Sequence, residues 1–333
     1  MCKMTNQPKS EVYLSDISST EGDVVFPFQV EALDIRGRAV HFGKVLDSIL
    51  TRHQYPEPVS YLLAEALVLT VLLGTSLKLE GKFILQTHSD GPVSMLVCDF
   101  TAPSHLRGYA RFDEKRLQQA VINNQTSPEV LLGKGTLALT IDQGNYTQRY
   151  QGIVALDGSS LQDVAHAYFA QSEQIPTNIH LAVTTLKNYD EQGKKWHAGG
   201  ILTQLLPQIP DHNAIHKTNK NSDVLKTCNQ LEDQWREAQA LTATIEDTEL
   251  TNPQIGSKRL LFSLFHEHSV RIFNAIPISD KCSCSHKKIK EILEGFSAEE
   301  RVQTIKNQRI TVTCEFCSTN YCFKPSELSE GSV

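Results

Sequence analysis

The sequence predicts an α/β core of the α+β kind, a helical connector and a small C-terminal module that carries four cysteines. Strand-like alternation and helical periodicity are interspersed up to about residue 206. A polar stretch and a helical region follow, and two close pairs of cysteines come last. These changes divide the chain into a polar lead-in at 1–22, the core at 23–210, the connector at 211–275 and the module at 276–333.

The composition is that of an ordinary soluble protein. The chain has 333 residues, of which 40% are hydrophobic and 21% charged, enough apolar material for a sizeable core. Its net charge of −6 argues against a general attraction to nucleic acid or to an anionic membrane. The N-terminal stretch lacks the apolar run of a secretory signal. We therefore expect a cytoplasmic protein, whose thiols stay reduced.

Helices and strands alternate in the first half of the predicted core. The pattern predicts a helix over 42–52 and a buried helix over the apolar stretch 61–77. Glu65 interrupts that stretch, which is shorter than the roughly 20 residues that a membrane span needs. Alternation predicts two strands within 82–100, with a turn at Asp90-Gly91-Pro92 between them. Further strands are expected within 106–112, 136–142 and 148–158.

The second half of the core is predicted to continue with a helix and two extended segments. Ser160 begins a helix over 160–174, and Asp163 has the spacing of a capping box with it. A strand is expected over 178–185. The segment 194–206 is expected to begin as a strand or loop, and its Gly199-Gly200 pair suits a tight turn or close packing.

The connector begins with a polar stretch at 208–223, which predicts a flexible loop. One helix is then expected over 231–250, and a second, shorter helix over 258–268. The apolar residues of the first helix recur at steps of three and four, which places them on one helix face: Leu231, Trp235, Ala238, Leu241 and Ile245.

The four paired cysteines are the strongest chemical signal in the sequence. Cys282 and Cys284 form a C-x-C pair, Cys314 and Cys317 form a C-x-x-C pair, and 29 residues separate the pairs. Two close pairs are typical of a tetrahedral four-thiolate zinc site, and soft thiolates favour zinc over hard cations. We predict one zinc ion per chain at these residues. His286 remains an alternative to one cysteine ligand.

The other thiols are given structural interpretations. Cys322 lies in a strand-like segment, and we expect it to pack rather than to bind metal. Cys2, Cys98 and Cys228 are isolated, and we expect small buried or incidental thiols there.

Oxidation of such a site has a predictable physical effect. A module of this size has little core of its own, and zinc contributes roughly 10–16 kcal/mol to such sites. That is as large as the typical stability of a whole domain, about 5–15 kcal/mol. A disulfide within each pair closes only a tiny loop, so two local bonds replace one long-range tie. The cysteines therefore allow a redox switch but do not prove one, because many four-cysteine zinc sites are static structural sites.

The sequence resembles a known family at this point. The segments KCSCS and CEFCSTNYCF resemble the cysteine motifs of the redox-regulated chaperones of the 33-kDa chaperonin family. Two segments resemble motifs of its core domain: RYQGIVALDGSSLQDVAHAYFAQSEQIPT and AGGILTQLLP. Three more segments are similar to the family's sequences: HQYPEPVSYLLAEAL, GKFILQTHSDGPVSML and FSLFHEHSVRIF. The resemblance covers about residues 24–328.

The resemblance implies a non-enzymatic chaperone whose zinc-bound, reduced form is inactive. On oxidative stress, disulfides Cys282–Cys284 and Cys314–Cys317 would form and zinc would leave. The module and the connector would lose structure, the protein would form a homodimer, and the core would serve dimerisation and client binding. Unfolding client proteins would then be held without ATP. The resemblance also implies that the connector packs on the core in the inactive form. The candidate client-binding residues are Leu231, Trp235, Leu241, Leu260, Leu261, Phe262 and Phe265.

Three features depart from the family pattern. Residue 318 is serine, where the family often has glycine. The loop at 211–223 is longer than usual. Cys228 and Cys322 are additional thiols near the switch, so the disulfide map and the activation threshold are left open.

Other functions are less compatible with the sequence. From Lys281 to Val333, eight Lys or Arg and seven Glu give +1, whereas nucleic-acid modules are strongly basic. The C-x-x-C motif alone permits a thiol–disulfide oxidoreductase, but it does not adjoin a βαβ unit. Four cysteine ligands leave no open position for a hydrolytic zinc, and no H-E-x-x-H motif is present. No Walker loop or G-x-G-x-x-G motif supports an ATP-driven chaperone.

Overall fold

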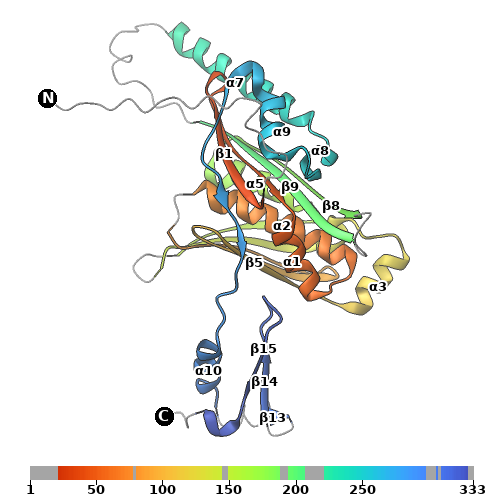
Figure 1. Cartoon of the computed structure of the whole chain (residues 1–333). Coiled ribbons are helices and arrows are strands. Elements are labelled where there is room, and N and C mark those ends of the chain that lie inside the picture. The colour runs from red at the N-terminus through yellow and green to blue at the C-terminus, as the bar shows by residue number, and fades with distance from the viewer. Residues whose placement is uncertain are drawn as a thin grey trace, which may run out of the picture.

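The computed structural model describes residues 22–77, 80–144, 149–187, 194–206, 221–297, 305–306 and 309–328. The predicted lead-in at 1–22 lies almost wholly outside these ranges. Of the predicted loop at 208–223, only 221–223 are described, and they begin a helix. The predicted α/β class with a C-terminal cysteine cluster is confirmed (Figure 1).

Two antiparallel sheets form the core. The first has the strand order β10-β1-β2-β9-β8, and β11 also pairs with β1. The second has the order β12-β5-β4-β3-β6-β7, in which β12 and β5 are parallel. The strands of the first sheet are β1 (Val24–Val30), β2 (Ile35–Phe42), β8 (Thr177–Lys187), β9 (Lys194–Leu205), β10 (Val270–Ile272) and β11 (Ile276–Pro277). Those of the second are β3 (Lys82–Ser89), β4 (Val93–Thr101), β5 (His105–Phe112), β6 (Lys134–Asp142), β7 (Tyr150–Asp157) and β12 (Ser279–Asp280).

A central helix separates the two sheets. The main core cluster joins residues of α2 (Glu57–Ser76) to both sheets, and α1 (Lys44–His53) lies beside it (Figure 1). By length and composition α2 is apolar enough to cross a membrane, but 83% of its most apolar window is buried inside the protein. The buried helix predicted over 61–77 is therefore confirmed, although it is longer than expected. Burial on all sides explains why its sequence has no polar face.

The strand and helix predictions in the core hold with one refinement, but they omit the strands β1 and β2 and two helices. The capping box of Ser160 and Asp163 begins α5 (Leu161–Tyr168), which continues as a π-helical turn at Phe169–Glu173. The segment expected to enter as a strand or loop at 194–206 is a single strand, β9. Helices α3 (Glu114–Ile122) and α4 (Pro128–Leu132) were missed, although Asp113 caps the first by accepting from two backbone amides.

The connector helices cover the outer face of the first sheet. They are α7 (Asn221–Ala243), α8 (Asp247–Thr251) and α9 (Gly256–Phe265) (Figure 1). The single helix predicted over 231–250 is wrong, because a capping box of Glu246 and Glu249 starts a new helix there. The turn between the two helices keeps Ile245 buried against the sheet, so the predicted apolar face is retained.

The two adjacent glycines of β9 are explained by close packing and not by a turn. A side chain at Gly199 would lie 2.0 Å from the carbonyl oxygen of Leu250 in α8. A side chain at Gly200 would lie 2.7 Å from Val68 of α2. The first glycine therefore lets the connector approach the sheet, and the second lets the central helix do so from the other side. His41 of β2 also reaches across, 3.3 Å from the carbonyl oxygen of Thr251.

The C-terminal region divides into a paired segment and a small module. Residues 270–280 form β10, β11 and β12, which pair with β1, β1 and β5 of the core. The module itself contains α10 (His286–Glu294) and a three-stranded sheet of β13 (Ile305–Lys306), β14 (Arg309–Thr313) and β15 (Asn320–Phe323). Its buried core cluster is small: Leu293, Ile310, Phe323 and Leu328. The boundary at 276 stays a prediction, but the first five residues beyond it contribute to the core sheets.

Candidate metal centre

The four cysteines lie on two segments that local structure holds in position. Cys282 and Cys284 lie in the extended segment between β12 and α10, and Ser285 caps that helix. Cys314 and Cys317 lie in the turn between β14 and β15. The amide of Ser318 donates to the carbonyl of Cys314 at 2.8 Å, which closes the turn. Ser318 adopts a left-handed φ of 54°, a conformation that favours glycine.

The four sulfur atoms meet at one point. All four lie within 4.8 Å of one another. The distance is 3.8 Å between the sulfurs of Cys282 and Cys314, and 3.3 Å between those of Cys284 and Cys317. Sulfurs around a tetrahedral zinc, each about 2.3 Å from the metal, lie about 3.8 Å apart. The sulfur positions therefore fit a four-thiolate metal ion, and a soft cation suits this donor set.

The environment gives Cys284, Cys314 and Cys317 different acidities. Burial raises the pKa of Cys284 to about 12, although the Tyr321 hydroxyl donates to its sulfur at 3.1 Å and opposes the rise. Burial also raises the pKa of Cys314. Burial acts in the same sense on Cys317, but hydrogen bonds with Thr319 and with the sulfurs of Cys284 and Cys314 outweigh it and lower that pKa to about 7. Metal binding would favour the thiolate form of all four, because a coordinated thiol loses its proton.

The cysteine turn is docked on the core through one face of β5. Phe316, between Cys314 and Cys317, lies under the guanidinium of Arg107, whose central carbon is 3.8 Å from the ring centroid. The Tyr109 ring meets the Phe316 ring edge-on, with centroids 4.8 Å apart. Arg107 also donates to the sulfur of Cys282 at 3.5 Å and is paired with the buried Asp99. One arginine therefore contacts both segments of the cluster.

Further contacts surround this docked turn. Arg111, two residues along the same face of β5, is paired with Glu315 at 2.7 Å. The Ser318 hydroxyl lies 3.2 Å from Nδ1 of His53, at the end of α1. Asp280, which lies just before the first cysteine pair, is ion-paired with Arg52. The exposed ion pair of Arg111 and Glu315 contributes little to the stability of docking. The stacking of Arg107 on Phe316 and the part-buried ion pair of Arg52 and Asp280 contribute more.

The sequence did not predict these docking residues. The alternation in LRGYARF places residues 107, 109 and 111 on one strand face, which was the available signal. It does not say what lies opposite, because the partners are about 200 positions later in the chain.

Other predicted residues lie outside the cluster. Within the part of the chain that the structure describes, His286 is absent from the metal-binding group, and its ring lies against Phe323 with centroids 4.3 Å apart. Cys322 is exposed on β15, so the expectation that it packs is wrong. Cys98 is a buried thiol, as expected. Cys2 and the side chain of Cys228 lie outside the described residues.

The candidate client-binding residues occupy the interface between connector and core. Leu260, Leu261 and Phe265 of α9 are buried in a cluster with the first sheet. Trp235 and Leu241 of α7 are half-buried and pack against that cluster. Leu231 and Phe262 are also half-buried but lie outside it. The structure therefore places most of this set against the sheet, and no client-binding role follows from burial alone.

A two-sheet α/β core that carries a four-cysteine, metal-binding module is the class of protein that this fold and site define. The family model described as Hsp33 protein matches residues 23–324. The chain therefore belongs to the Hsp33 family. Relatives of the family are named chaperonins, which indicates a chaperone rather than an enzyme.

Individual relatives agree over nearly the whole chain. The "33 kDa chaperonin" of Caulobacter vibrioides is 41% identical over 318 residues, covering 94% of this chain and 99% of that protein. The protein of the same name from Proteus mirabilis is 32% identical, covering 92% and 95% of the two chains. The crystal structure of the 33 kDa chaperonin (heat shock protein 33 homolog) from Thermotoga maritima matches with a TM-score of 0.69. At 21% identity and 92% and 97% coverage, that match shows the shared fold.

Proposed function

We propose that this protein is a redox-regulated holdase, inactive with zinc bound and activated when its cysteines are oxidised. The observation that carries the proposal is the meeting of two cysteine pairs, 29 residues apart in sequence, at sulfur separations within 4.8 Å. One ion at this point would hold both ends of the module together. Membership of a chaperone family supports the same conclusion.

The folding of the module would depend on that metal ion because the module's own core is small. Among the described residues of the module, four form its buried cluster, against the extended core between the two large sheets. Zinc would contribute roughly 10–16 kcal/mol of folding free energy through Cys282, Cys284, Cys314 and Cys317. Loss of the ion is therefore expected to unfold the module.

Oxidation would remove the ligands in pairs. Each disulfide forms when two thiolates give up two electrons, and peroxide can accept them and be reduced to water. Once the module unfolds, sequence neighbours meet far more often than distant residues, since loop-closure entropy grows with separation. We infer the pairs Cys282–Cys284 and Cys314–Cys317. The pairing Cys282–Cys314 and Cys284–Cys317, between the sulfurs that are closest in the folded cluster, is the alternative.

The link from the cluster to client binding would be the connector. Its buried apolar residues on α7 and α9 face the first sheet. The residues that precede Cys282 pair with both sheets, so the connector and the cluster share one continuous chain segment. Release of the module would loosen this segment and expose the apolar face to unfolding proteins. The activated form would be a cytoplasmic homodimer that needs neither ATP nor nucleic acid.

The test compares three forms of the full chain in an assay of client aggregation by light scattering. They are the reduced zinc form, a form treated with peroxide at mildly raised temperature, and a reduced form stripped of zinc by a chelator. Zinc release is followed in parallel with a chromogenic chelator, and disulfides are mapped by peptide mass spectrometry. The third form separates loss of the metal from formation of disulfides.

We expect aggregation to be suppressed after oxidation, with about one zinc released per chain and the two local disulfides formed. The reduced zinc form should not suppress aggregation. Retention of zinc under oxidant, with no suppression in any form, would leave a static zinc site and contradict the proposal. Disulfides that join the two pairs would contradict the proposed pairing but not the switch.

A further inference from the structure

Two histidines lie together on the face of the first sheet that the connector covers. His41 belongs to β2 and is 6% exposed, and its Nε2 lies 3.3 Å from the carbonyl oxygen of Thr251 in α8. His197 belongs to the neighbouring strand β9, two residues before Gly199 and therefore on the same face. The centroids of the two imidazole rings are 5.6 Å apart. This histidine pair, His41 and His197, thus lies at the contact between the core and the connector.

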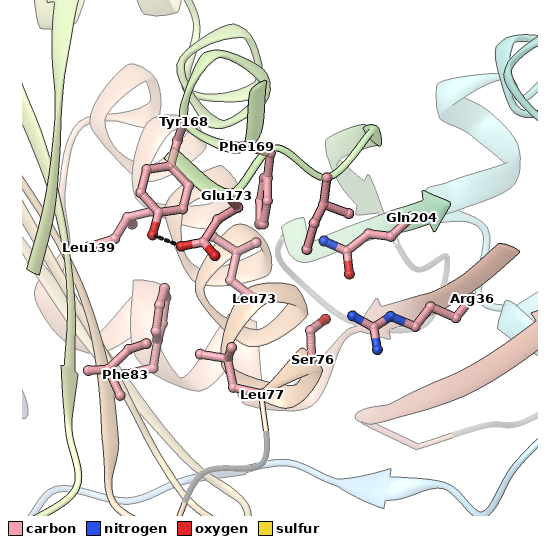
Figure 2. Close-up of a pocket in the computed structure, with 12 residues that line it drawn as sticks. Arg36, Leu73, Ser76, Leu77, Phe83, Leu139, Tyr168, Phe169, Glu173 and Gln204 are labelled. Atoms are coloured by element: carbon pink, nitrogen blue, oxygen red, sulfur yellow. Dashed lines mark hydrogen bonds between the residues drawn. The ribbon is translucent and has the colours of Figure 1, made fainter. Parts of the chain in front are cut away.

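The hydrogen bonding of the histidine pair favours neutral rings. The carbonyl of Thr251 can only accept, so Nε2 of His41 carries the proton of its neutral ring. Nδ1 of His197 is buried and has no hydrogen-bond partner among the described residues. Buried polar groups usually have one, as Tyr168 and Glu173 do in the small cavity of Figure 2, where the tyrosine donates at 2.7 Å. A proton added to Nδ1 of His197 would lack an acceptor.

Burial keeps both rings neutral near pH 7. It lowers the pKa of His41, although the hydrogen bond to Thr251 opposes the fall. Burial also lowers the pKa of His197, and the charge that His41 would gain lowers it further. When α8 leaves the sheet, water reaches His41 and ionisation costs less. Protons therefore bind the detached form more tightly than the docked form, and a fall in pH favours detachment.

Charged groups of the core act in both directions on this balance. Asp23 raises the pKa of both rings, and Asp47 raises that of His197. Backbone amides already donate to both carboxylates. Lys195 lowers the pKa of His197. Burial outweighs the two carboxylates, because the pKa of each ring stays below its ordinary value.

On the connector side, one ion pair opposes release in acid. Asp247 of α8 pairs with His180 of β8 at 2.9 Å, and protonation of that histidine would strengthen the contact. The pair contributes little, because the Asp247 side chain is 76% exposed. Glu249, also on α8, already accepts from the amide of Glu246. The buried histidine pair therefore determines the direction of the effect.

We propose that His41 and His197 make docking of the connector sensitive to acid, so that their protonation below about pH 6.5 releases α8 from the first sheet. This release breaks no covalent bond and needs no change at the cysteines. Any effect of acid on client binding rests on the function proposed above, whereas the release itself does not.

Hydrogen exchange tests the release in the reduced, zinc-loaded full chain. Amides over 249–251 are followed at pH 7.5 and pH 5.5, with rates corrected for the intrinsic effect of pH. His41→Gln keeps a donor for Thr251 but cannot become charged, and His197→Gln is a second, independent variant. His88→Gln, at an exposed position of β3, is the matched control. Thermal unfolding at pH 7.5 checks that each variant folds, and a chromogenic chelator checks zinc content at both pH values.

We expect opening of α8 in the wild type to become about tenfold more frequent at the lower pH, since each histidine contributes at most about tenfold per pH unit. His88→Gln should show the same increase. His41→Gln should reduce the increase several-fold, and His197→Gln should reduce it as well. No increase in the wild type, or an equal increase in both histidine-pair variants, would overturn the proposal.

An assay of client aggregation at pH 5.5 separates this proposal from the proposed function. Suppression by the reduced wild type with its zinc retained, and its loss in His41→Gln, would support both. Faster exchange over α8 without suppression would support acid release and count against the link between the connector and client binding.

Discussion

The guanidinium of Arg107 stacks on the ring of Phe316, with 3.8 Å between the guanidinium carbon and the ring centroid. Arg107 belongs to β5 of the core, and Phe316 lies between two of the clustered cysteines. The contact therefore joins the core directly to the candidate metal centre. Cation–π and edge-on aromatic contacts of this kind are each worth about 0.5–2 kcal/mol.

Phe316→Ala should weaken the hold of the core on the cysteine turn without removing a metal ligand. We expect zinc to pass to a chromogenic chelator several-fold faster than from the wild type, with an unchanged zinc content before the challenge. Phe296→Ala is the control, because Phe296 is 40% exposed in the same module and has no part in the contact. Equal release rates for the wild type and the Phe316 variant would show that docking does not stabilise the centre.

The cysteines should differ sharply in their effect on metal content. Cys284→Ser removes one of the four sulfurs, and we expect zinc affinity to fall by more than the roughly 10–100-fold that loss of an outer residue costs. Cys322→Ser changes an exposed thiol on β15 outside the cluster, and zinc content should not change. Competition titration with a zinc chelator measures both. A Cys322 variant as poor in zinc as the Cys284 variant would disprove the assigned ligand set.

Gly199→Ala should detach part of the connector from the sheet. The new methyl group would lie 2.0 Å from the backbone oxygen of Leu250, so α8 must move. We expect a loss of stability of about 1–3 kcal/mol and faster amide exchange over 247–251. On the proposed mechanism, the reduced variant should also suppress client aggregation in part.

Gly22→Ala is the matched control for this change, because no atom of the described residues lies within 4 Å of the added carbon. Unchanged exchange over α8 in the Gly199 variant would mean that the close approach does not position the connector. Faster exchange without any client binding would separate connector release from chaperone activity.

Glu65 should make the folded protein less stable as the pH rises. Burial, followed by the charges of Glu129 and Asp247, raises its pKa from 4.5 to about 7. Between those values the unfolded chain has released this proton while the folded chain still holds it, so stability falls with rising pH. Glu65→Gln removes this dependence and should stabilise the protein at pH 8 by up to about 3 kcal/mol.

Urea unfolding between pH 5 and pH 8 measures this effect. The difference in unfolding free energy between Glu65→Gln and the wild type should be small at pH 5. It should grow as the pH rises toward 8. Glu80→Gln, at an exposed position, should give no such gap. Parallel stability curves for the wild type and Glu65→Gln would show that the carboxyl is ionised in the folded protein.

The sequence predicted what short-range patterns determine. Cysteine spacing marked the cluster, and apolar periodicity marked the central helix and the connector face. The break at 244–246 was missed because a turn can preserve the burial of Ile245 while it interrupts the helix. The docking of Phe316 on Arg107 was missed because long-range pairing leaves no mark on local spacing. Serine at 318 was noted as a departure, and the structure adds that its hydroxyl meets His53 despite the left-handed backbone.

The parallel pairing of β12 with β5 gives the two cysteine pairs unequal reach after the module unfolds. As long as the amide of Lys281 donates to the carbonyl of Leu106, before the paired segment loosens, Cys284 stays within about 10 Å of the core on a fully extended tether. Cys314 lies 30 residues further along, and the same tether allows it roughly 110 Å. Cys282 and Cys284 would therefore react close to their own core. Cys314 and Cys317 would reach far enough from it to meet another molecule. A mixed disulfide between two chains, or with a client, should accordingly involve Cys314 or Cys317 far more often than Cys282 or Cys284.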